Sequence, residues 1–240
     1  IKKIMKEKLD IEEIKQKMFD KLQPSGWGKV LKPFIFSGDF DKIISQLATL
    51  AKDGKRFTPP LKQVFRAFEE CPYDKLQVVI VGQDPYPQLG VADGIAFSCS
   101  NTDKLQPSLK FMLQEVDRTV YNNHVISEQL DLSRWSNQGI LMLNTALTVE
   151  VNKIGSHYDI WKPFTAYLLD YLNNYNPGLV YAYLGKKAEE WSDLTTNTEH
   201  KFFVKHPASA AYSKSKWDSN DIFNKISTVV KNTSGNEITW

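Results

Sequence analysis

Four short runs of consecutive apolar residues stand out along the chain, at positions 77–82, 139–144, 179–184 and 201–205. Neighbouring positions within a run are apolar instead of alternating with polar ones. This pattern is typical of strands that are buried on both faces, as in a parallel sheet covered by helices. The runs therefore predict the strands of a central sheet.

Helical patterns separate these runs and follow the last one. Apolar residues recur at spacings of three and four over 108–121, 160–173, 186–191 and about 220–230. Strands that alternate with helices pair in parallel, and the connecting helices cover both faces of the sheet. We therefore expect an α/β fold with three layers, α/β/α, around a central four-stranded, mainly parallel sheet.

The beginning of the chain also has helical patterns. Apolar residues in the segment 1–23 recur at helical spacing, with lysines and glutamates between them. We expect a basic helical segment packed on a single domain that spans residues 1–240. Such a charged helix face is ordinarily only exposed to solvent; the alternative is that this basic helix contacts DNA. Further helices are expected near 39–52 and 64–68.

The composition fits one globular domain and excludes several classes of protein. The chain has 240 residues, of which 42% are hydrophobic and 24% charged, unlike a disordered, collagenous or disulfide-stabilised chain. No apolar run approaches the roughly 20 residues that span a bilayer, so we expect no membrane partner. The formal net charge of +2 argues against a histone-like protein but leaves a local nucleic-acid-binding face open.

The two cysteines, Cys71 and Cys99, indicate a reducing compartment. They stand alone, without the spacing of a metal site and with little reason to form a disulfide. The cytoplasm is the simplest location, with the nucleus or a viral host compartment as alternatives. We expect the protein to be a monomer.

Polar residues follow each of the four predicted strands. They are Gly82-Gln83-Asp84-Pro85-Tyr86-Pro87, Asn144-Thr145, Gly185-Lys186-Lys187 and His206-Pro207-Ala208-Ser209. Ligands of parallel sheets bind at the carboxyl ends of the strands, so we expect these residues on one rim. Alone, Asp84 is an ordinary turn former, Asn144 a strand end and His206 a loop residue. Together they indicate an active site.

Several other kinds of site have no support in the sequence. The four histidines, His124, His157, His200 and His206, form no His-x-x-x-His pair and no Cys/His cluster, so no metal is expected. The chain has no Gly-x-Ser-x-Gly turn of the serine hydrolases and no Gly-rich phosphate-binding loop. An Asp/His site without a metal or cofactor remains.

The segment Gly82-Gln83-Asp84-Pro85-Tyr86, after a Val-Val-Ile-Val strand, resembles the water-activating motif of family 1 uracil-DNA glycosylases. Further segments match this family in the same order. They are Asp93-Gly94-Ile95-Ala96-Phe97-Ser98, Gln106-Pro107-Ser108-Leu109, the strand end at 141–149, Ser156-His157 ahead of Trp161 and Phe164, His206-Pro207 and the closing Trp240. The resemblance extends from about Trp27 to the C-terminus, and so many motifs in one order make it specific.

The resemblance implies an enzyme that removes uracil from DNA in base excision repair. It would hydrolyse the N-glycosidic bond of a flipped-out deoxyuridine, in single- or double-stranded DNA, and leave an abasic site. By the same resemblance, Asp84 orients the water and stabilises the sugar cation, and His206 stabilises the uracil anion. The expected uracil-binding residues are Gln83, Tyr86, Phe97 and Asn144.

The resemblance also predicts that loops on this rim grip the DNA backbone. The residues are Pro59, Pro60, Pro107, Ser108, Gly185, Lys186, Ser209, Ala210 and Tyr212, and Lys187, Lys205, Lys214 and Lys216 would add positive charge. A DNA-mimicking protein inhibitor is a further expected partner.

Three positions depart from the family pattern. Ala210 stands where the family usually has a leucine that enters the space vacated by the base, and alanine is too short to fill it. Either base extrusion is weaker here, or Tyr212 or a nearby side chain replaces the leucine. Pro87 replaces a histidine and Lys186 replaces a serine, which affects DNA contacts of the loops more than the catalytic residues.

Two other functions stay open on the sequence alone. One is a glycosylase-fold protein that binds DNA or serves replication with little turnover. The other is a glycosylase for another damaged or mismatched base. Asp84, Asn144 and His206 favour an active enzyme, while Tyr86 and Asn144 favour uracil as its target.

Overall fold

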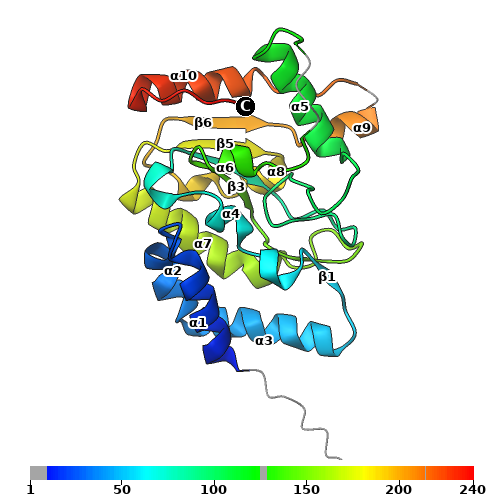
Figure 1. The fold of residues 1–240 in the computed structure, drawn as a ribbon, viewed down its shortest axis with the longest axis vertical. Helices are drawn as coiled ribbons and strands as arrows, with labels where there is room; N and C mark the ends of the chain where they lie inside the picture. The colour runs from blue at the N-terminus through cyan, green and yellow to red at the C-terminus, as the bar shows by residue number, and fades with distance from the viewer. Residues whose placement is uncertain (1–9, 125–128, 214) are drawn as a thin grey trace, which may run out of the picture.

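A four-stranded parallel sheet forms the centre of the molecule (Figure 1). The computed structural model describes residues 10–124, 129–213 and 215–240, without the side chains of 212 and 213. The strands, in the order β3-β2-β5-β6, are Ile140–Asn144 (β3), Val78–Gly82 (β2), Val180–Leu184 (β5) and Lys201–Val204 (β6). Each coincides with a predicted run, and every pair is parallel. The predicted fold class is confirmed.

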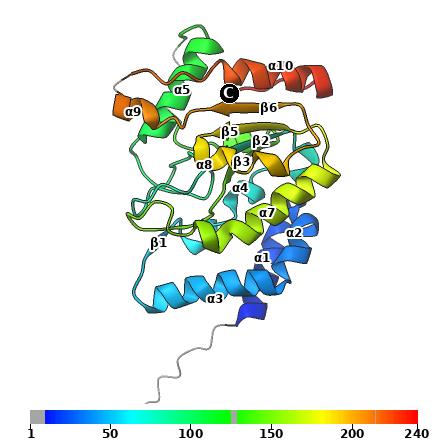
Figure 2. The same ribbon diagram turned by 180° about the vertical axis from the view of Figure 1, so that it is seen from behind.

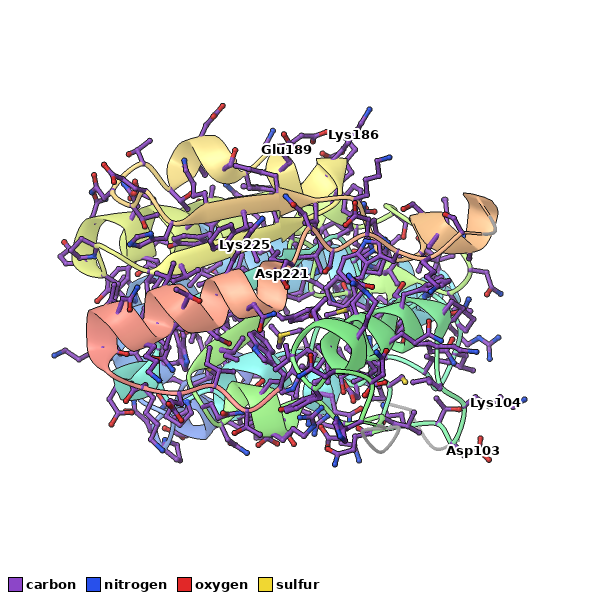
Figure 3. The ribbon with its side chains drawn as sticks, turned by 90° about the horizontal axis from the view of Figure 1, so that it is seen from above. Asp103, Lys104, Lys186, Glu189, Asp221 and Lys225 are labelled. Carbon is purple, nitrogen blue, oxygen red and sulfur yellow. The ribbon has the colours of Figure 1, made fainter. Side chains whose placement is uncertain are left out.

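Helices cover both faces of this sheet, in agreement with the burial of every residue in β2, β3 and β5. The principal ones are α5 (Pro107–Thr119), α7 (Tyr158–Tyr175), α8 (Lys186–Glu189) and α10 (Ile222–Ser234), and all overlap predicted helical patterns. Viewed along the sheet, α5 and α10 lie on one side, and α7 and α8 on the other (Figure 3). Within the residues that the structure describes, no helix has the length and hydrophobicity of a membrane span.

Three helices from the beginning of the chain lie together beside α7, at one end of the molecule (Figure 2). They are α1 (Ile11–Leu22), α2 (Trp27–Ile35) and α3 (Gly38–Lys52). α1 packs against α2, and residues 1–9 of the predicted basic segment lie outside the described residues. α2 was not predicted, because Gly26 and Pro33 obscure its short apolar pattern.

Shorter elements surround the sheet. The helix expected near 64–68 begins two residues later, as the short helix α4 (Arg66–Glu69), and a turn of 3-10 helix, η1 (Leu61–Gln63), precedes it. The antiparallel ribbon of β1 (Phe57–Thr58) and β4 (Val149–Glu150) was not predicted, since two-residue strands have no readable pattern. The remaining elements are η2 (Tyr73–Lys75), α6 (Ser133–Ser136), η3 (Ser192–Leu194) and α9 (Ser209–Ser213).

The register of the sheet brings the ends of its strands together. Gly82 pairs with Asn144 at the ends of β2 and β3. Beside them, the Gly185 N–H donates to the Val204 carbonyl at 2.8 Å, just after β5 and at the end of β6. The segments that follow the four strands therefore meet at one rim, as the apolar runs predict.

Candidate active site

A cavity of about 160 Å³ opens at the carboxyl ends of the strands. It is lined by every residue that the sequence predicts for catalysis or uracil binding: Gln83, Asp84, Tyr86, Phe97, Asn144 and His206. Strand order thus brings residues that are far apart in sequence into one site. In the described part of the chain, no group of three or more His, Cys, Asp or Glu side chains is placed to hold a metal ion.

The carboxylate of Asp84 is held by neutral groups. Its Oδ2 accepts a hydrogen bond from the Gly155 N–H at 2.7 Å, and the Tyr158 hydroxyl faces the same carboxylate and lowers its pKa. Burial raises the pKa of Asp84, and these donors partly oppose that rise. Among the described residues, none forms an ion pair with Asp84. Its negative charge is therefore available to a group in the cavity.

His206 presents a neutral imidazole to the same cavity. Burial lowers its pKa to about 4, so the ring carries no charge at neutral pH. Its Nδ1 accepts from the Ala208 N–H at 3.2 Å, which leaves the single ring proton on Nε2 as a donor. Gly185, with a φ of +99°, permits this placement, because a Cβ there would lie 2.9 Å from the Cβ of His206.

The floor of the cavity lies where β2 and β3 end. A Cβ at Gly82 would lie 2.8 Å from the Asn144 Oδ1 and 3.1 Å from the Phe97 ring, so only glycine leaves both side chains in place. Asn144 is 8% exposed, and its side-chain amide has no hydrogen-bond partner among the described residues. Because Asn144 lines the cavity, its amide can donate to and accept from a group bound there.

A network around Asp93 holds the loop that carries Phe97. The fully buried Asp93 carboxylate accepts from the Ser98 hydroxyl at 2.6 Å and pairs with Arg66 at 3.0 Å. The Tyr86 hydroxyl donates to the Phe97 carbonyl at 2.9 Å. Phe97 itself has a φ of +66°, an uncommon conformation for a residue with a side chain. These contacts hold its ring at the wall of the cavity.

The residues predicted to bind DNA differ in their exposure. Pro60, Pro107 and Lys186 are exposed, Ser209 is half-buried, and Pro59, Ser108, Gly185 and Ala210 are buried. Tyr212 belongs to α9, but its side chain and the whole of Lys214 lie outside the described residues. Figure 3 shows Lys186 at the end of the sheet where α9 lies. Ala210 is only 3% exposed, so the residue at the leucine position does not project from the surface.

Three residues of this site were not predicted, and all lie next to Ser156-His157. Ile154 lines the cavity and is 68% exposed, Gly155 donates to Asp84, and Tyr158 contacts the same carboxylate. The match at Ser156-His157 marked this segment. Nothing local shows that its neighbours reach a carboxylate 71 positions away in sequence.

Known proteins are similar in sequence to this chain. The family model described as Uracil DNA glycosylase superfamily matches residues 68–230. The chain belongs to the uracil-DNA glycosylase superfamily. The resemblance that its motifs indicate is confirmed.

Relatives of this superfamily member match most of its length. A uracil-DNA glycosylase of Streptococcus pneumoniae is 31% identical over 223 residues, which cover 91% of this chain and 99% of the relative. Uracil-DNA glycosylase 1 of Listeria innocua is 32% identical over 220 residues, which cover 89% of this chain and 96% of the relative. The crystal structure of mimivirus uracil-DNA glycosylase has a TM-score of 0.78 at 25% identity and covers 92% of this chain and 88% of its own.

Proposed function

We propose that this superfamily member excises uracil from DNA by hydrolysing the N-glycosidic bond of a flipped-out deoxyuridine. One observation carries the proposal: the Asp84 carboxylate, which has no counter-ion among the described residues, lines one cavity with the neutral His206 imidazole and the Asn144 amide. The relatives in S. pneumoniae and L. innocua, both named uracil-DNA glycosylase, support the same substrate. Release of the base leaves an abasic site, which is then processed in base excision repair.

The reaction needs a negative group beside the sugar and hydrogen-bond donors beside the base. Departing uracil takes the bonding electrons as an anion, and the sugar becomes cation-like. Asp84 stabilises this cation and orients the water that attacks it. One carboxylate is enough because the uracil anion is a good leaving group. Ordinary glycoside hydrolysis needs a second acid to protonate the leaving alcohol.

His206 acts on the leaving base. From Nε2, its neutral ring donates a hydrogen bond to the uracil O2, where negative charge collects. The lowered pKa supports this role, because the imidazole stays neutral across the physiological pH range. No proton has to be transferred to the base for this stabilisation.

Base selection follows from hydrogen-bonding pattern and shape. Asn144 offers an acceptor to the N3–H and a donor to the O4 of uracil, and cytosine presents the opposite pattern. Tyr86 occupies the space beside C5, where a thymine methyl would overlap with it. Phe97 stacks on the flipped base, and Gln83 contributes backbone contacts.

The rim holds the DNA backbone without reading its sequence, through the residues predicted for that role. The buried Ala210 does not enter the duplex. Ile154 fits the role of the nearby side chain that replaces the usual leucine, because it is apolar, exposed and part of the cavity lining. It would enter the base stack as the uracil leaves.

A DNA-mimicking protein inhibitor is expected to bind the same rim. A mimivirus UNG variant is known in complex with UGI, and its structure has a TM-score of 0.79 with this chain at 25% identity. Such an inhibitor would compete with DNA for the exposed positive charge of residues such as Lys186. We expect the enzyme to act as a monomer in a reducing compartment, most simply the cytoplasm.

Release of free uracil tests the proposed function. Single- and double-stranded oligonucleotides that contain uracil are incubated with wild type and with Asp84→Asn, with a chelator present. We expect wild type to release uracil from both substrates and the variant to lose this activity. Tight DNA binding by wild type without any release would overturn the proposal and favour the DNA-binding or replication-accessory alternative.

A further inference from the structure

Tyr158, the first residue of α7, contacts both the Asp84 carboxylate and the loop that holds it. Its ring packs against the backbone of Gly155, whose N–H binds the Asp84 carboxylate, and its hydroxyl faces that carboxylate and lowers its pKa. A Cβ at Gly155 would lie 3.1 Å from the Tyr158 Cε2, so glycine permits this close approach. The Gly155 N–H in turn donates to the Asp84 Oδ2 at 2.7 Å. The three residues thus form a closed triangle of contacts.

Further hydrogen bonds fix the loop of this triangle. The Asn152 N–H donates to the Pro87 carbonyl at 2.9 Å, which ties the loop to the segment after the carboxylate. The Glu150 N–H donates to the Ser156 hydroxyl at 2.9 Å and closes the loop on itself. The hydroxyl of Tyr158 therefore approaches the carboxylate from a well-supported backbone.

A neutral donor suits a carboxylate that has to keep its charge. A Lys or Arg partner would cancel the negative charge that the sugar cation needs. A hydroxyl stabilises the anion and leaves its charge in place. Burial and the negative charge of Asp84 raise the pKa of Tyr158, so the hydroxyl keeps its proton and remains a donor.

We propose that Tyr158 is a positioning residue for Asp84, which it holds in the orientation that aims the carboxylate at the attacking water. The inference rests on the proposed function, because it assigns a role within the same reaction. Orientation matters at a reacting group, where a displacement of about 1 Å can slow the reaction by about 100-fold. Loss of the hydroxyl frees one side of the carboxylate, while the Gly155 N–H still holds the other.

Removal of the hydroxyl also changes the pH at which Asp84 loses its charge. Burial raises the pKa of Asp84, and the Tyr158 hydroxyl lowers it. Without the hydroxyl, the carboxylate is protonated at a higher pH, so activity falls earlier as the solution is acidified. The other titratable groups around the pair are His206, which lines the same cavity and is neutral, and Glu190 after α8, whose charge acts on Tyr158.

The test is Tyr158→Phe, which removes the hydroxyl and keeps the ring on Gly155. Uracil release from a single-stranded oligonucleotide, which requires no extrusion from a duplex, is measured between about pH 5 and pH 9. At neutral pH we expect kcat to fall by about 10- to 100-fold with little change in KM. We also expect the acid limb of the profile to move up by about one pH unit, which corresponds to one hydrogen bond to a charged group.

Tyr175→Phe is the matched control, because Tyr175 ends α7 and is 69% exposed. We expect its profile to equal that of wild type, and circular dichroism shows whether both variants are folded at the assay temperature. A Tyr158→Phe profile like that of wild type would overturn the inference. So would a slower rate with an unmoved acid limb, which indicates a packing role. Absence of release by wild type would instead overturn the proposed function.

Discussion

Two loops line the same cavity, and each carries an aspartate with a different set of partners. Asp93 is fully buried, pairs with Arg66 at 3.0 Å and accepts from the Ser98 hydroxyl at 2.6 Å. Asp84 accepts a hydrogen bond from the Gly155 N–H and faces the Tyr158 hydroxyl, and among the described residues it forms no ion pair. A buried charge is costly unless a counter-charge or hydrogen bonds compensate it. Compensation is therefore nearly complete at the first aspartate and partial at the second.

This difference separates a structural carboxylate, Asp93, from Asp84, the carboxylate that we propose is reactive. Arg66, together with hydrogen bonds from Ser98 and Ser100, compensates the charge of Asp93, so this carboxylate anchors the loop of Phe97 and contributes little negative potential to the cavity. The charge of Asp84 stays directed at the cavity, and its raised pKa reflects the stability that the fold gives up to keep it there. Partners, more than residue type, decide which role a carboxylate takes.

The largest expected effect is the loss of the reactive charge. Asp84→Asn keeps the size of the side chain but removes its charge, so uracil release should slow by about 1,000-fold. The free energy of unfolding should not fall, because a poorly compensated charge is removed. Release assays and urea denaturation measure the two quantities. A variant that keeps about a tenth of the wild-type rate would show that the cavity does not use this charge.

The compensated carboxylate should behave in the opposite way. Asp93→Ala removes a buried partner of Arg66 and Ser98, so the free energy of unfolding should fall by about 3 kcal/mol. Asp103→Ala is the matched control, because Asp103 is exposed (Figure 3) and its loss should change stability by less than about 0.5 kcal/mol. Urea denaturation measures both. Equal free energies of unfolding for the two variants would contradict the structural role of Asp93 on which the comparison of the two loops depends.

The pH dependence of stability tests another group of the cavity, His206. Its pKa is about 4 in the folded protein and near 6.5 when unfolded, so between these values the unfolded chain binds more protons. The stability that His206 contributes is therefore lost as the pH falls, by about 2 kcal/mol at about pH 5. The raised pKa of Asp84 acts in the opposite direction but is shared by wild type and His206→Asn. Identical pH slopes for these two proteins would contradict a neutral, buried imidazole.

A smaller effect should distinguish the role of Ile154, at the rim of the cavity, from that of the Asp84 carboxylate. Ile154→Ala leaves the contacts of Asp84 intact, so release from single strands should not change. Release from duplex DNA should slow by about tenfold, because insertion of the Ile154 side chain into the base stack offsets part of the free energy that unstacking the uracil costs. Leu194→Ala, at an exposed leucine outside the cavity lining, is the control. Equal slowing on both substrates would assign Ile154 to catalysis instead of base extrusion.

The smallest effect concerns the charge of the rim. Lys186→Ala should weaken DNA binding about two- to threefold at moderate salt and reduce the slope of log affinity against log salt by about one. Fluorescence anisotropy at several salt concentrations measures this slope. Lys29→Ala, at an exposed position of α2, should leave it unchanged. The idea fails if both variants change the slope equally.

Much of this architecture was predictable because it produces local patterns in the amino-acid sequence. Burial on both faces produces consecutive apolar residues in β2, β3 and β5, and parallel order brings the residues after those strands to one rim. Asp84, Asn144 and His206 could be placed together for that reason. Their adjacency depends only on strand order and not on the detail of side-chain packing.

Contacts between residues that are distant in sequence produce no such pattern. The contact of Gly155 with Asp84 joins residues 71 positions apart, and neither neighbourhood has a distinctive pattern. The pairing of Arg66 with Asp93 is equally invisible in the sequence. Ala210 was noticed as a missing leucine, but its burial and the exposure of Ile154 on another loop depend on the packed structure.

Substitution of Gly82 should damage the cavity severely. A side chain there would have to displace the Asn144 Oδ1 at 2.8 Å and the Phe97 ring at 3.1 Å, so the proposed recognition of uracil depends on the absence of a Cβ at this position. A library randomised at this codon and selected for repair should return glycine alone. A redesign of the cavity for other bases has to keep glycine at position 82 and change the residues around it.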